Sequence, residues 1–258
     1  MEFGELWRWL DRVRRWQWVS ALVAALADMM WVLLPSDCVV CGGRDAVLCT
    51  ACRNDFHRAT LKPFRAEEAA EALPLDLETN EVLPVWAAGL YKDGVSSTLL
   101  AFKNHQRFTL KTELGRALAR SLARALEEIQ GAIGEVLIVP IPASAASMRK
   151  RGYWPVGELL KVALKSVRAG PSVGLAPILK VAGATGSSHR GASARDRRSQ
   201  RGRMSVVAGL EPARGEHVIL VDDVLTTGAT LAKAHAVLSE SGYCVIGAVV
   251  LAATQNPR

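Results

Sequence analysis

Residues 217–230 read His217-Val-Ile-Leu-Val-Asp-Asp-Val-Leu-Thr-Thr-Gly-Ala-Thr230, and the fold expected for this chain depends on them. The aliphatic run Val218–Val221 has the length and composition of a strand buried on both faces, as in a parallel sheet. Two carboxylates, Asp222 and Asp223, stand where we expect this strand to end. A Thr/Gly loop then leads into a helical run over 231–238, so the stretch predicts a strand, a loop and a helix.

The loop after this strand is suited to bind a phosphate. Hydroxyls and free backbone N–H groups meet there at the positive end of a helix dipole, on Thr226, Thr227, Gly228, Ala229 and Thr230. Two carboxylates beside a phosphate suit a polyol such as ribose, whose neighbouring hydroxyls each donate a hydrogen bond. The alternative is an ordinary β–α corner with a threonine N-cap. The complete pattern resembles the phosphoribosyl pyrophosphate motif of type I phosphoribosyltransferases.

Length and charge limit the class of protein. The chain has 258 residues, enough for one ordinary domain and an appendage, and 50% of them are hydrophobic, as in globular proteins. The net charge of +7 favours anionic partners. The charge alone does not distinguish among phosphorylated sugars, nucleic acid and acidic proteins as partners.

Four of the five cysteines form two Cys-x-x-Cys pairs, Cys38 with Cys41 and Cys49 with Cys52. With no signal-peptide pattern, we expect a reducing compartment and a metal site rather than a disulfide framework. Two such turns complete a closed shell of four thiolates, which predicts a structural zinc ion in a small zinc-ribbon-like module. Four unrelated thiols or a redox pair are the alternatives. Cys244 lies in an apolar run and is expected to be a buried strand residue.

Residues 1–35 are expected to form an N-terminal helix. The apolar run 18–34 has 17 residues, fewer than the roughly 20 needed to span a bilayer, and Asp28 interrupts it. Arginines precede the run and several tryptophans flank or lie in it, as in a helix at a membrane surface. Packing on a protein domain, peripheral membrane contact and spanning are the alternatives. We expect a cytoplasmic protein, either free or in peripheral contact with the inner face of the membrane.

The remaining elements alternate between strands and helices. Strands are expected at 85–91, 135–141, 175–181, 206–207 and 245–251, and helices at 95–102, at 110–129 and from Val156 onward. This alternation predicts an α/β fold with a parallel sheet flanked by helices, in which ligands bind beyond the carboxyl ends of the strands. The expected domains are the helix 1–35, the four-cysteine module 36–58, a connector 59–84 and the α/β domain 85–258.

Two basic segments follow strands of the expected sheet. The first is a loop of small residues, with Ala143 and Ser144, that closes with Arg149, Lys150 and Arg151. Its hydroxyls and N–H groups can contact pyrophosphate oxygens while the cations neutralise charge, although a solvated basic turn is the alternative. The second carries six arginines between Arg190 and Arg203, including Arg195, Arg197 and Arg198. It lies between strands rather than in a tail.

The order and spacing of these pieces resemble the ComF family, from about Pro35 onward. The matching pieces are the cysteine pairs, the motif at 217–230, and four further segments: Leu99-Leu-Ala-Phe-Lys103, Val139-Pro-Ile-Pro142, Arg151-Gly-Tyr153 and Arg190-Gly-Ala-Ser-Ala-Arg-Asp-Arg-Arg198. Two places differ. Members often have Asn-Gln where Trp154-Pro155 follows Tyr153, and the arginine segment commonly begins with Gln and a Leu where this chain has His189-Arg190-Gly191.

The resemblance implies a type I phosphoribosyltransferase-like fold and binding of phosphoribosyl pyrophosphate with magnesium. It also implies a link to natural competence, with single-stranded DNA and proteins of the DNA-uptake machinery as partners.

The resemblance also suggests roles for single residues. Asp222 and Asp223 would hold the ribose hydroxyls, the threonine loop the 5′-phosphate, and Arg149 to Arg151 the leaving pyrophosphate. Lys103 is also expected to bind substrate, and Arg195, Arg197 or Arg198 would contact pyrophosphate or nucleic acid. Two functions compete, a pentosyl transferase of unknown acceptor and a non-catalytic sensor that also binds nucleic acid. The sequence has no recognisable base-specificity loop, which weakens a nucleobase-salvage interpretation.

Overall fold

The computed structural model describes residues 37–75, 80–105, 107–129, 136–167, 173–181, 204–207 and 216–255. The expected N-terminal helix and the arginine segment lie outside the described residues. In the part that is described, no helix is both long and apolar enough to cross a membrane. The chain divides into two compact units, Met1–Cys49 and Thr50–Arg258. The four domains expected from the sequence stay predictions.

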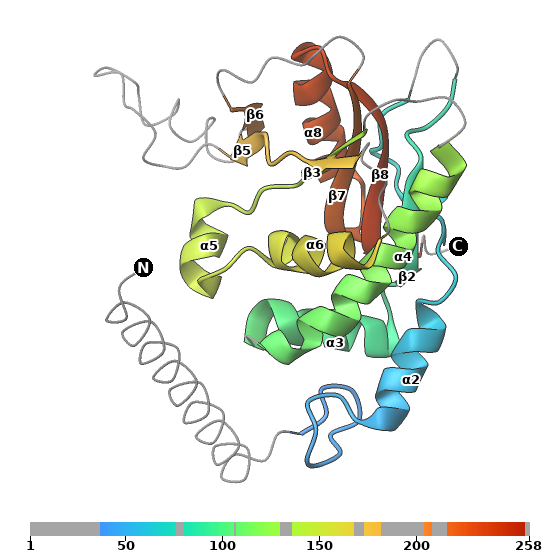
Figure 1. Cartoon of the computed structure of the whole chain (residues 1–258), viewed down its shortest axis with the longest axis vertical. Coiled ribbons are helices and arrows are strands. Elements are labelled where there is room, and N and C mark those ends of the chain that lie inside the picture. Colours follow the sequence, from blue (N-terminus) through green and yellow to red (C-terminus); the bar gives the residue numbers. More distant parts are fainter. Residues whose placement is uncertain are drawn as a thin grey trace, which may run out of the picture. The chain divides into compact units, whose positions relative to one another are not determined.

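A mostly parallel sheet forms the centre of the second unit (Figure 1). Its six strands lie in the order β1-β2-β8-β7-β3-β4, and β1 alone pairs antiparallel. The strands are β1 Phe64–Arg65, β2 Val85–Leu90, β3 Val136–Pro140, β4 Val173–Leu175, β7 His217–Leu225 and β8 Cys244–Ala253. The α/β fold with a largely parallel sheet is therefore confirmed.

Helices cover both faces of this sheet. The described helices are α2 Thr50–Ala59, α3 Asp93–His105, α4 Lys111–Ile129, α5 Ala145–Arg151, α6 Pro155–Ser166 and α8 Ala229–Glu240, with the 3-10 turns η1 Glu67–Ala69 and η2 Phe108–Leu110. Helix α8 buries Leu231 and Leu238 in one cluster with Val218 and Leu220 of β7. Helices α4 and α6 pack together, α4 against β2 and β8 and α6 against β7. A separate two-stranded antiparallel sheet joins β5 Leu179–Val181 to β6 Met204–Val206.

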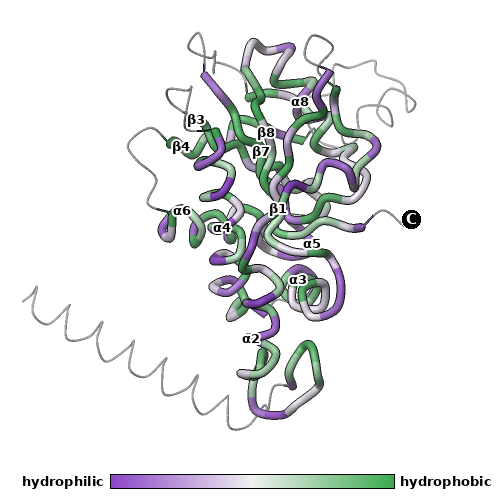
Figure 2. The backbone as a smooth tube through the Cα atoms, turned by 90° about the vertical axis from the view of Figure 1, so that its right-hand side faces the viewer, coloured by the Kyte–Doolittle hydropathy of each residue, from purple (hydrophilic) through white to green (hydrophobic). Residues whose placement is uncertain are grey.

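The predicted strand Val218–Val221 is buried on both faces, with none of its four residues exposed. Figure 2 shows the central strands β7 and β8 as hydrophobic. The strand is longer than expected, because β8 continues to pair with it beyond Val221, at Asp222 and as far as Leu225. Asp222 and Asp223 therefore lie inside the strand rather than at its end.

Three further expectations are wrong. The expected loop 143–153 contains helix α5, which Ser144 caps by accepting a hydrogen bond from the Ser147 N–H at 3.1 Å. The expected strand 175–181 is two short strands in different sheets, with Pro177 between them. Cys244 is exposed rather than buried, because it is the first residue of β8.

Candidate functional site

The sheet reverses its winding direction between β3 and β7. The chain leaves β3 through α5 and α6 toward β4, whereas it leaves β7 through α8 toward β8, on the other side (Figure 1). Such a switch point opens a crevice beyond the carboxyl ends of the two strands, where ligands bind in open α/β sheets. The loop 141–144 and the loop 226–228 both follow these strand ends.

The loop after β7 presents donors to this crevice. Thr226, Thr227, Ala229 and Thr230 are exposed, whereas Gly228 is buried at the N-cap of α8. The first hydrogen bond inside the helix runs from the Ala232 N–H to the Gly228 carbonyl, at 2.9 Å. The N–H groups of the preceding turn have no partner within the helix, and that of Ala229 lies 3.4 Å from Thr227 Oγ1, at the long limit of a hydrogen bond. They are therefore placed to bind an anion.

A segment of the expected connector packs on this loop. The Ala72 N–H donates to the Thr227 carbonyl at 2.9 Å, and a Cβ atom at Gly228 would lie 2.8 Å from Leu73 Cγ. A trans peptide points its C=O and N–H in opposite directions. The hydrogen bond from Ala72 therefore directs the Gly228 N–H away from the connector. Sequence reasoning missed this contact because residues 65–83 show no periodicity.

The two acids of β7 are held differently. Asp222 Oδ1 accepts a hydrogen bond from the Asp223 backbone N–H at 2.8 Å. Asp223 Oδ2 forms an ion pair with Lys103 Nζ at 2.7 Å, with side chains only 13% and 22% exposed. Lys103 comes from the last turn of α3, so the structure brings together three of the predicted site residues.

Burial and the neighbouring Asp223 carboxylate raise the pKa of Asp222 to about 7, while the Asp223 N–H and Lys103 act in the opposite direction. Asp222 therefore gains or loses its proton near neutral pH. As a carboxylate it accepts hydrogen bonds, and as a carboxylic acid it also donates one. The pair can thus match ribose hydroxyls in either state.

The loop after β3 places the other predicted residues. The Ser144 hydroxyl caps α5, while Ala143 is half-buried. Along α5, Arg149 and Lys150 are exposed and Arg151 is half-buried. Arg195, Arg197 and Arg198 lie outside the described residues.

Trp154, where the sequence departs from the ComF pattern, fixes the end of β3. Its indole Nε1 donates to the Ile141 carbonyl at 3.1 Å. A Cβ atom at Gly157 would lie 2.6 Å from the Trp154 ring, so only glycine leaves room for the indole there. The tryptophan therefore holds the loop that leads to α5.

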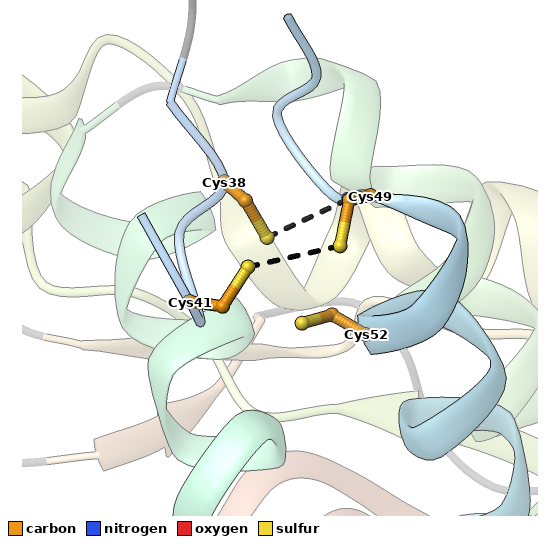
Figure 3. A group of neighbouring side chains, drawn as sticks. All are labelled: Cys38, Cys41, Cys49 and Cys52. Carbon is orange, nitrogen blue, oxygen red and sulfur yellow. Dashed lines mark hydrogen bonds between the residues drawn. The ribbon is translucent and has the colours of Figure 1, made fainter. Parts of the chain in front are cut away.

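The four predicted metal ligands form a cluster (Figure 3). The sulfur atoms of Cys38, Cys41, Cys49 and Cys52 all lie within 4.8 Å of one another, and Cys41 Sγ lies 3.7 Å from Cys49 Sγ. A tetrahedral zinc–thiolate centre with Zn–S bonds of about 2.3 Å requires sulfur separations of about 3.8 Å, so the donors fit that metal.

Backbone N–H groups support the thiolates of this cluster. The Gly43 N–H lies 3.4 Å from Cys41 Sγ, and the Cys49 N–H lies 3.5 Å from Cys38 Sγ. Burial raises the pKa of Cys38, but N–H groups of Cys41, Cys49 and Val40 outweigh it and lower this pKa to about 6. A thiolate near neutral pH is the form that binds a metal.

The cluster predicts the effect of removing one thiol. Purified protein should contain about one zinc per chain, and Cys49→Ser should lose most of it because three thiolates leave the shell open. Metal analysis by mass spectrometry measures this directly. Cys244→Ser is the matched control, since it removes an exposed thiol outside the cluster. Equal zinc content in the two variants contradicts the assignment.

The raised pKa of Asp222 predicts a pH-dependent stability. The folded carboxyl binds its proton more tightly than the unfolded one, so the free energy of unfolding falls as pH rises from about 4 to about 7. Asparagine does not titrate, so Asp222→Asn removes this loss of stability with rising pH. The melting temperature of the variant minus that of the wild type should therefore increase between pH 5 and pH 8, as followed by circular dichroism. A difference in melting temperature that does not change with pH contradicts the raised pKa of Asp222. Asp45→Asn, at an exposed acid, is the control.

Gly228 predicts a second stability effect. Gly228→Ala places a Cβ atom at φ +83°, against Leu73, and should cost about 1–3 kcal/mol of the free energy of unfolding in urea titration. Gly152→Ala is the matched control, because φ is +76° there but no atom lies within 4 Å of the added Cβ. Equal losses in both variants would show that the contact with Leu73 contributes nothing.

Two comparisons with known proteins agree with this geometry. The phosphoribosyl transferase domain model matches residues 112–258, more than half of the chain. A 43-residue segment is 54% identical to an adenine phosphoribosyltransferase of Mycolicibacterium gilvum (strain PYR-GCK), covering 17% of this chain and 24% of that protein. The chain thus matches about a quarter of the length of this relative. The match over 112–258 shows that the chain belongs to the phosphoribosyl transferase domain family.

Proposed function

We propose that this chain binds phosphoribosyl pyrophosphate with magnesium and transfers its phosphoribosyl group to a nitrogen acceptor. The observation that carries the proposal is the pairing of Lys103 with Asp223 beside the loop 226–230, at the switch point of the sheet. The loop can bind the phosphate of a sugar phosphate. The acid pair, whose negative charge Lys103 partly balances, can accept hydrogen bonds from the sugar hydroxyls. The family match supports this substrate class.

In this proposal the loop 226–230 holds the 5′-phosphate through its hydroxyls and N–H groups. Asp222 and Asp223 hold the ribose hydroxyls. As the bond to pyrophosphate breaks, positive charge develops on the sugar ring and negative charge on the leaving group. Carboxylates near the ring stabilise the first charge, and cations stabilise the second.

Arg149, Lys150 and Arg151 of α5 are the proposed partners of the leaving pyrophosphate, with Arg195, Arg197 or Arg198 as further candidates. Magnesium, when bound with the ligand, neutralises part of the pyrophosphate charge. Lys103 limits the charge of the acid pair in the ligand-free site. With Asp222 protonated and Asp223 paired with Lys103, the three groups carry no net charge, and loss of the Asp222 proton leaves them with one negative charge.

The ComF-type role remains a proposal beyond this activity. It rests on the motif order and on the net charge of +7, which favour single-stranded DNA as a partner. The acceptor and the DNA-uptake partners belong to this proposal. So do peripheral contact of residues 1–35 with a membrane and a zinc ion at the four cysteines. A sensor that binds phosphoribosyl pyrophosphate without turnover is the alternative.

The site predicts a loss of ligand binding in an acid-pair variant. Changing both Asp222 and Asp223 to Ala removes two hydrogen-bond acceptors, each contributing about 1 kcal/mol or more, so affinity should fall about tenfold or beyond. Calorimetry with phosphoribosyl pyrophosphate and magnesium measures this. Glu81→Ala, at an exposed acid outside the site, is the control for a lost surface charge. Equal affinity in wild type and a folded double variant would sink the proposed ribose contact.

Release of pyrophosphate separates an enzyme from a sensor. Wild-type protein, phosphoribosyl pyrophosphate and magnesium are incubated with a panel of nucleobases or with single-stranded DNA. Pyrophosphate released only with one acceptor, and lost in the acid-pair variant, supports transfer to that acceptor. Binding without release under every condition favours the sensor.

A further inference from the structure

Tyr153, which has no assigned role, contacts the helix that carries Lys103. Its hydroxyl donates a hydrogen bond to the backbone carbonyl of Phe102, in the last turn of α3. The tyrosine itself follows Gly152, which ends α5 with φ +76°. One side chain thus joins the ends of two helices that lie far apart in the sequence.

The carbonyl that Tyr153 contacts is one that the helix alone leaves without support. The last four carbonyls of a helix have no partner inside it, and α3 ends at His105. The preceding carbonyl, of Ala101, accepts from the Arg107 N–H at 3.5 Å. The Tyr153 hydroxyl therefore stabilises the turn that would otherwise fray first.

Ring packing reinforces this contact. The buried Phe102 ring meets the Tyr153 ring edge-to-face, with centroids 5.5 Å apart. The Phe108 ring, 43% exposed, lies 4.7 Å from the Tyr153 ring and 6.5 Å from the Phe102 ring, so the three rings form one cluster. Two neighbouring rings therefore hold the phenol, and removal of its hydroxyl alone leaves these ring contacts in place.

The residue after Phe102 is Lys103, whose Nζ reaches Asp223 at 2.7 Å. We propose that Tyr153 is a positioning residue, which fixes the last turn of α3 so that the Lys103 ammonium stays against Asp223. The same tyrosine follows directly on the helix that carries Arg149 and Lys150. It thus links the cationic helix to the acid pair. The positioning of Lys103 by Tyr153 is argued from contacts alone, whereas the expected effect on ligand affinity rests on the proposed function.

The first experiment observes Lys103 without ligand. In the ligand-free wild type, the Lys103 ammonium should give a resolved nitrogen–proton NMR signal at low temperature because its ion pair slows exchange, and Lys103→Met assigns it by its loss. In Tyr153→Phe, which keeps the ring, this signal should broaden or disappear. Tyr91→Phe removes a hydroxyl elsewhere in the same unit and should leave it unchanged. An unchanged signal in Tyr153→Phe overturns the proposal.

The second experiment is a double-mutant cycle on ligand affinity. Tyr153→Phe should weaken binding of phosphoribosyl pyrophosphate about threefold, as expected for one lost hydrogen bond. In the Lys103→Met background the same change should have almost no effect, because Tyr153 acts through Lys103. Equal losses in both backgrounds mean that Tyr153 acts independently, which overturns the proposal. Absence of ligand binding by the wild type rejects the proposed function instead, and the NMR signal still decides the positioning.

Discussion

The unequal pairing of β7 with its two neighbours is the constraint on which the site depends. On one side β8 pairs as far as Leu225, whereas on the other the last β3 partner is Pro140, opposite Val221. Proline has no N–H group, and Pro142 follows closely, so β3 cannot continue as a paired strand. The Ile141 N–H still reaches the Val221 carbonyl, at 2.8 Å, before the chain turns away into α5. Asp222 and Asp223 are thereby held by a paired strand on one side and border the crevice on the other.

Rigid placement of two adjacent carboxylates has an electrostatic cost, which the fold meets by two routes. The proton that Asp222 retains up to about pH 7 removes one charge, and the ammonium of Lys103 balances the other. Only the second route requires a distant element, α3, and the last turn of that element is itself supported by Tyr153. The Lys103 side chain is 22% exposed and so still reaches water, which leaves its charge available to a polyanion while it stays against Asp223. An ion pair of this kind therefore permits both a stable empty site and a charged ligand.

Local patterns predicted the elements well, whereas contacts between distant segments were not predictable. Val218–Val221 was identifiable as a buried strand because its composition alone requires burial on both faces. The family resemblance placed Lys103 in the substrate-binding set, but nothing in the sequence near Asp223 indicates that the two side chains pair, since tertiary packing of α3 decides that contact. The bond from Ala72 to Thr227 was missed for the same reason. Helix α5 was missed although local signals existed, a serine cap at Ser144 and a glycine after the last turn.

The cysteine cluster and the acid pair pose the same physical problem in different surroundings. Both concentrate anionic groups within a few ångströms, and like charges at that distance need a compensating cation or bound protons. At the acid pair an internal lysine supplies the cation, and the core of the sheet supplies rigidity. At the cysteines only residues 37–49 and the first turn of α2 are involved, too few to bury a core of their own. Backbone N–H groups already favour the Cys38 thiolate, so a dication bound there would both offset part of the negative charge of the cluster and hold its turns in place.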